Sequence, residues 1–135
     1  MTAKEWLSRG WTINREIDAL EEARRTAFER CTSTTRAVKE RVHGTGSRHD
    51  HMAAYAALSE EIDNAVNRLM TTEREILQTV MQLENGIYRQ VLAGRYIRFQ
   101  TWSEIAQDLN YSNMQVYRIH EKALAAVQPI VEKTL

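Results

Sequence analysis

Two long segments of the chain repeat apolar residues at alternating steps of three and four positions, and this repetition constrains the fold more than any other feature. The first segment runs from about residue 2 to 42 and the second from about residue 51 to 84. Such spacing puts the repeated residues on one stripe of an α-helix and is typical of helices that pack along a shared seam. No sustained period-two alternation occurs, so the sequence predicts an all-α protein.

The residues between the two segments predict a reversal of the chain. Residues 43–47 include two glycines, which end helices and permit a turn. Folding the segments back here sets Cys31 level with Ile62 and predicts a long antiparallel coiled-coil hairpin. In this register Arg24 and Glu73, which interrupt the two seams, lie in neighbouring layers, where an opposite pair is tolerated better than a lone charge. An intermolecular bundle that uses the same stripes is the alternative.

The residues after position 84 predict three shorter helices, over about residues 87–97, 102–109 and 113–127. Thr101 and Glu104 form the pattern of a capping box, and Ser112 can cap the last helix. Asn110, between the last two helices, tolerates the left-handed backbone of a tight turn. Pro129 is expected just beyond the last helix, because proline disrupts a helix interior.

The stretch from Thr101 to His120 has the spacing of a helix-turn-helix. We therefore expect a hairpin over residues 1–84, with Trp6 docking on a DNA-binding domain over residues 85–135. Ala106 is small enough for the two helices to approach closely, and Val116 and Ile119 anchor the second helix on the first. A three-helix core without any DNA role has the same pattern.

The outward positions of the second helix are the expected DNA-binding residues. They are Ser112, Asn113, Met114, Gln115, Tyr117, Arg118 and Lys122. Arg118 can bond a guanine edge at two points, and Met114 can contact a thymine methyl group. Ser112 and Gln115 suit phosphate contacts, and Arg95 and Arg98 are expected to reach phosphate from the preceding segment. His120 is expected on the surface.

A resemblance adds to this interpretation. Residues 92–96 (LAGRY), 101–106 (TWSEIA) and 116–124 (VYRIHEKAL) resemble region four of bacterial sigma factors. With the opening MTAKEWL and the hairpin, the chain resembles small sigma-like proteins of phages and prophages of Gram-positive bacteria, related to the RinA and ArpU groups. The resemblance implies a late-gene transcription regulator that binds double-stranded promoter DNA, through Asn113, Met114, Tyr117 and Arg118 as base-contacting residues, and acts with host RNA polymerase. No counterpart of sigma region two is recognisable.

Composition narrows the remaining classes. The 18 basic and 18 acidic side chains give zero net charge, so DNA binding must depend on a local patch. No stretch approaches the roughly 20 apolar residues of a membrane span, and no secretory leader is recognisable. One cysteine, Cys31, provides neither a disulfide nor a metal site. We expect a cytoplasmic protein of a bacterial host cell, without cofactor, metal or membrane contact.

Two further expectations concern activity and partners. No nucleophile–base pair is present, so we do not expect an enzyme. A two-helix ribbon has a thin core, which favours self-association into a homodimer. The main alternative function is a phage packaging or assembly adaptor that uses the hairpin for protein–protein contacts.

Overall fold

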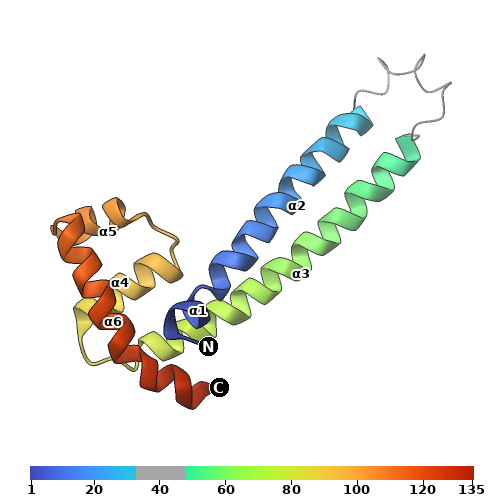
Figure 1. Ribbon diagram of the computed structural model, residues 1–135. Helices are drawn as coiled ribbons and strands as arrows, with labels where there is room; N and C mark the ends of the chain where they lie inside the picture. The colour runs from blue at the N-terminus through green and yellow to red at the C-terminus, as the bar shows by residue number, and fades with distance from the viewer. Residues whose placement is uncertain (33–47) are drawn as a thin grey trace. The chain divides into compact units, whose positions relative to one another are not determined.

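Every regular element in the part of the chain that the structure describes, residues 1–32 and 48–135, is an α-helix (Figure 1). In this computed structural model the helices are α1 (Ala3–Leu7), α2 (Arg9–Thr32), α3 (Arg48–Val80), α4 (Gly86–Tyr96), α5 (Trp102–Leu109) and α6 (Asn113–Thr134). The long antiparallel pair α2 and α3 and the C-terminal helices confirm the expected all-α class. The expected reversal at residues 43–47 lies outside the described residues.

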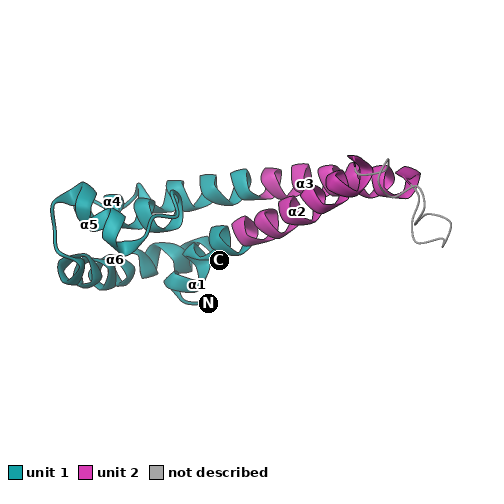
Figure 2. Ribbon diagram, turned by 90° about the horizontal axis from the view of Figure 1, so that it is seen from above, with its two compact units in different colours: residues 1–12, 69–135 teal, residues 13–68 magenta. Residues whose placement is uncertain are grey.

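The chain divides into two compact units, coloured separately in Figure 2. Unit 1 combines residues 1–12 with residues 69–135, and unit 2 contains residues 13–68. Unit 1 therefore joins the two ends of the chain in one body. The expected boundary after residue 84 concerns independently folding domains and stays a prediction.

In unit 2, the register of α2 against α3 differs from the expected one. Arg24 Nη1 donates to Ser59 Oγ at 3.5 Å, and its guanidinium lies 5.8 Å from the centre of the Tyr55 ring. The expected register set Arg24 beside Leu69, which lies ten positions after Ser59 on α3. The predicted proximity of Arg24 and Glu73 is therefore wrong. Arg24 instead meets a hydroxyl group and an aromatic face, which compensate for its position in the seam.

A repeating seam does not by itself select one register. Two helices can slide by one or more steps of the repeat and still bring apolar stripes together. Contacts that do not repeat mark the observed register: Arg68 pairs with Glu16 at 3.1 Å, and the Phe28 and Tyr55 rings lie 5.9 Å apart. In the described residues of unit 2, the buried apolar side chains are two isoleucines and two alanines, namely Ile17, Ala27, Ile62 and Ala65.

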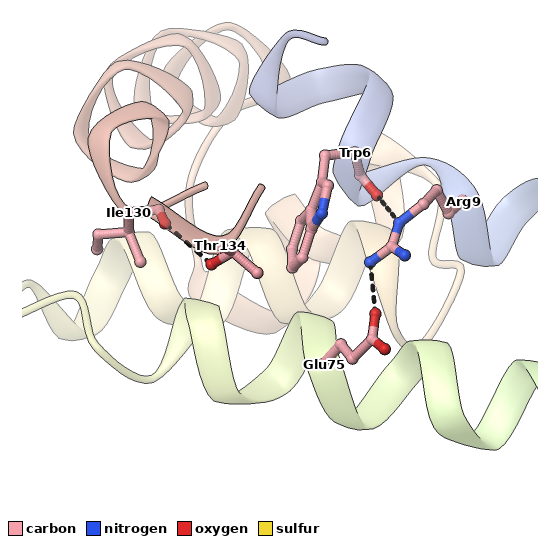
Figure 3. Close-up of polar contacts among 5 residues, drawn as sticks. All are labelled: Trp6, Arg9, Glu75, Ile130 and Thr134. Carbon is pink, nitrogen blue, oxygen red and sulfur yellow. Dashed lines mark hydrogen bonds and ion pairs between the residues drawn. The ribbon is translucent and has the colours of Figure 1, made fainter. Parts of the chain in front are cut away.

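The main core of unit 1 forms where α1 docks against α3 and α6. Its buried members are Ala3, Trp6, Leu7, Ile76, Val80, Leu83, Leu92, Tyr96, Ala123, Val127 and Val131. Docking of Trp6 on the C-terminal helices is thus confirmed. Arg9 links α1 to α3, because its Nε donates to the Trp6 carbonyl at 2.9 Å while its Nη2 pairs with Glu75 at 3.0 Å (Figure 3).

Helix α6 continues beyond the expected end and contains Pro129. Proline removes one backbone hydrogen bond to the residue four positions earlier, which here is Ala125. Both residues are exposed, so water can satisfy the carbonyl that proline leaves free. The turns around Pro129 bury Val127 and Val131 completely, and this burial offsets the lost bond.

A second core holds α4, α5 and α6 together. Its buried residues are Val91, Ile105, Ala106 and Val116, with Ile87, Trp102, Leu109 and Ile119 partly buried around them. Gly94 permits this packing, since a Cβ there would lie 2.7 Å from Gln100 Oε1 and 3.3 Å from Ile105 Cγ1. The small residues Gly94 and Ala106 therefore set how closely α5 lies against its neighbours.

Candidate nucleic-acid interface

Helices α5 and α6 form a helix-turn-helix whose ends are capped largely as expected. Asn110 adopts the left-handed conformation, with φ of 58°, and ends α5. Ser112 and Gln115 exchange two hydrogen bonds, of 2.8 and 3.1 Å, in a complete capping box. At Thr101 the box is partial, because its hydroxyl accepts from the Glu104 amide while the Glu104 carboxylate accepts from that hydroxyl instead of from the backbone.

All seven expected DNA-binding residues are exposed at the start of α6. These residues are Ser112, Asn113, Met114, Gln115, Tyr117, Arg118 and Lys122. Because residues four apart neighbour one another on a helix, two rows result. Asn113 and Tyr117 form one row, and Met114, Arg118 and Lys122 form the other. Arg118 and Lys122 form no ion pair with any residue in the described ranges.

Two neighbouring residues of α5 contact the first row. Asn113 Nδ2 donates to Ser103 Oγ at 3.3 Å. The Tyr117 ring meets the Trp102 ring edge to face, with centroids 5.2 Å apart. Neither contact is among the features predicted from the sequence. The spacing of a helix-turn-helix is the one signal that could have suggested that the first turns of both helices meet.

Arg95 serves a different purpose from the expected phosphate contact. Its Nη1 donates to the Gln100 carbonyl at 3.0 Å, and its guanidinium lies 4.3 Å from the Trp102 ring and 4.9 Å from the Trp11 ring. Trp11 Nε1 in turn donates to the Arg95 carbonyl at 2.9 Å. Arg95 thus supports Trp102 from inside the unit, whereas Arg98 is exposed.

His120 is buried, which corrects the expectation of a surface residue. Only 4% of it is exposed, and its Nε2 lies 2.7 Å from the Tyr96 hydroxyl, with the two rings stacked. Burial lowers the pKa of His120 to about 4, although neighbouring Glu121 acts in the opposite direction. Burial also raises the pKa of Tyr96 to about 12. His120 is therefore neutral at pH 7 and adds no charge to α6.

A family model described as a protein of unknown function, DUF1492, matches residues 30–128, most of the chain. The chain belongs to the DUF1492 family. The match begins inside α2 and ends inside α6, so it includes the helix-turn-helix but leaves α1 outside. No curated protein and no solved structure matches the chain.

The candidate interface of this DUF1492 protein carries little positive charge. Residues 86–122 contain five basic side chains, at positions 89, 95, 98, 118 and 122, and three acidic ones, at 104, 108 and 121, so their net charge is plus two. Two of the five basic side chains form hydrogen bonds within the protein. Arg89 donates to the Leu83 carbonyl at 2.6 Å, and Arg95 donates to the Gln100 carbonyl. The other three, Arg98, Arg118 and Lys122, are exposed.

Within residues 1–32 and 48–135, no group of three or more His, Cys, Asp or Glu side chains is arranged to hold a metal ion. In the same ranges, no helix is long and apolar enough to cross a membrane.

Proposed function

We propose that this DUF1492 protein is a non-enzymatic, DNA-binding transcription regulator related to the RinA and ArpU groups of phages. The observation that supports this most strongly is the capped α5–Asn110–α6 unit with its two exposed rows of side chains. A helix held in this way can enter the major groove of double-stranded promoter DNA and offer its first turns to base edges. The resemblance to sigma region four points to the same use of α6.

The two rows suit different parts of the DNA. Arg118, near the middle of the exposed face, has a planar guanidinium that matches the two acceptors of a guanine edge. Met114 precedes it by one turn and offers an apolar contact for a thymine methyl group. Lys122, one turn further on, is suited to phosphate, which fixes the position of the helix without distinguishing bases.

The small positive charge implies weak binding by the protein alone. Each phosphate neutralised by a basic side chain adds to the dependence of affinity on salt. Three exposed basic side chains, Arg98, Arg118 and Lys122, therefore give a shallow dependence and a modest affinity. We therefore propose that host RNA polymerase, or a second copy of the chain, supplies the missing binding free energy. In that case promoter binding is stronger in the joint complex than with either protein alone.

A binding titration on promoter fragments, with and without RNA polymerase, tests this proposal. We expect Arg118→Ala to cost about 1–3 kcal/mol on the preferred sequence and to relax sequence preference. Lys122→Ala should weaken binding to all sequences alike. Lys133→Ala is the matched control, because it removes an exposed charge from the last turn of α6, away from the two rows of side chains at its start. If Arg118→Ala leaves promoter binding and activation intact, the role of α6 is wrong.

An assembly or packaging adaptor is the second candidate function. The observation that favours it is a set of large apolar side chains exposed on α3 and directly after it: Met70 and Leu77 in the helix are 57% and 44% exposed, and Met81, which follows its last residue, is 59% exposed. Exposed apolar groups on one helix are typical of protein-binding surfaces. The same titration separates the candidates, since an adaptor would show no DNA association under any of its conditions.

A further inference from the structure

The first turn of α5 holds two side chains of the recognition helix in place. Ser103 and Trp102 are adjacent in the chain, while Asn113 and Tyr117 lie one helical turn apart on α6. One contact is a hydrogen bond of 3.3 Å and the other an edge-to-face ring contact of 5.2 Å. Two different interactions therefore fix the same row of α6.

The hydrogen bond from Asn113 to Ser103 leaves the carboxamide oxygen of Asn113 free. A carboxamide has one acceptor oxygen and one nitrogen that carries two N–H donors. In the structure Nδ2 donates one of its two N–H groups to Ser103 Oγ, so Oδ1 stays free to accept from a partner outside the protein, and the second N–H stays free to donate. In the major groove, an outside acceptor fits the exocyclic amines of adenine and cytosine, whereas guanine and thymine present acceptors at the equivalent edge.

The ring contact supports this arrangement from the adjacent turn. Trp102 is itself held by the Arg95 guanidinium at 4.3 Å and by an edge-to-face contact with His120 at 4.7 Å. Tyr117 consequently packs against a Trp102 ring that other side chains hold in place, while 43% of Tyr117 stays exposed. Side chains fixed before binding lose less rotational freedom in a complex, which increases the discrimination that each contact provides.

We infer that Ser103 is a specificity-determining positioning residue, which holds the Asn113 carboxamide so that its oxygen faces the groove and selects a base with an exocyclic amine, adenine or cytosine. This inference rests on the proposed function. It assigns part of the sequence preference to α5, although none of the expected base-contacting residues lies on that helix. Ser103 itself touches no base in this role, because it acts through Asn113.

Selection of bound DNA from a randomised library tests the inference, with the full chain and, where needed, RNA polymerase. At one base position the parent should prefer adenine or cytosine. Ser103→Ala frees the carboxamide to turn, so this preference should fall about fivefold, the effect of one hydrogen bond, while the salt dependence is unchanged. Ser103→Thr keeps the hydroxyl group and should retain the parent's preference.

A variant of the contacting residue provides an independent test. Asn113→Asp presents only acceptors, so it should keep the preference for an amine while binding all DNA less tightly, because its negative charge approaches phosphate. Loss of the amine preference in Asn113→Asp, or an unchanged preference in Ser103→Ala, would overturn the inference and leave the proposed function standing. A parent without any DNA association would overturn both.

Discussion

At the scale of single residues, the Tyr96–His120 pair connects stability to pH. Both side chains are nearly inaccessible, and they satisfy each other through one hydrogen bond between α4 and α6. A charged imidazole would be costly there, which is why burial lowers the pKa of His120 to about 4. The unfolded chain has no such environment, so its histidine titrates near the ordinary value of 6.5.

This difference predicts that acid destabilises the protein through His120. Between pH 6.5 and about 4 the unfolded state binds a proton that the folded state does not, so stability falls as the pH is lowered through this window. One such group contributes at most about 1.4 kcal/mol per pH unit. His120→Gln keeps a polar partner for Tyr96 but does not titrate. Thermal unfolding of both proteins across this range should show a steeper loss in the parent, and equal slopes would contradict the assignment.

At the scale of elements, α1 is short but completes the core of unit 1. Ala3, Trp6 and Leu7 are all buried against α3 and α6, and the Ala3 amide donates to Gln128 Oε1 at 2.7 Å. The family match begins only at residue 30, so this helix lies outside the matched region. The last turns of α6 bury their apolar side chains in the same cluster as α1, and each element therefore depends on the other.

Removing the largest side chain of α1 tests this dependence. Trp6 is 3% exposed, so Trp6→Ala should lower the free energy of unfolding by about 3–5 kcal/mol, through lost burial and the cavity left behind. Lys4→Ala, an exposed position on the same helix, should change it by less than about 0.5 kcal/mol. Chemical denaturation measures both. A Trp6→Ala protein as stable as the parent would show that α1 contributes little to the core.

At the scale of the whole molecule, zero net charge and the thin core of unit 2 both favour association with a partner. Only Ile17, Ala27, Ile62 and Ala65 are buried apolar side chains among the described residues of that unit. Helix α3 also carries five of the twelve exposed large apolar side chains of the described chain, namely Met52, Tyr55, Val66, Met70 and Leu77. Such groups lower the free energy of the protein when another surface covers them.

We therefore predict that the protein self-associates at micromolar concentration. Because the exposed groups on α3 are apolar, higher salt should not dissociate the dimer. Leu77→Glu, at a position that is 44% exposed, should weaken association without unfolding the chain, and Arg74→Ala is a neighbouring exposed control. Analytical ultracentrifugation gives the mass of each protein. A parent that sediments only as a monomer would contradict the prediction.

The sequence by itself determined the features that depend on neighbours within a few positions. The three-and-four repeat specified helices, Thr101 and Ser112 began α5 and α6, and Asn110 made the turn between them. The seven outward residues of α6 could be identified for the same reason, since a helix of known phase exposes a known face. Local hydrogen bonds and helical geometry decide each of these features.

Tertiary structure decided what depends on distant partners. The α2–α3 register could not be predicted because a repeating seam fits itself in several positions. His120 is buried because Tyr96, 24 positions away, accommodates it, and Trp11 meets Arg95 across 84 positions. Pro129 lies within α6 because α1 and α3 bury the turns around it. The Ser103–Asn113 contact required the packed angle of two helices, since only packing places a side chain of one beside a side chain of the other.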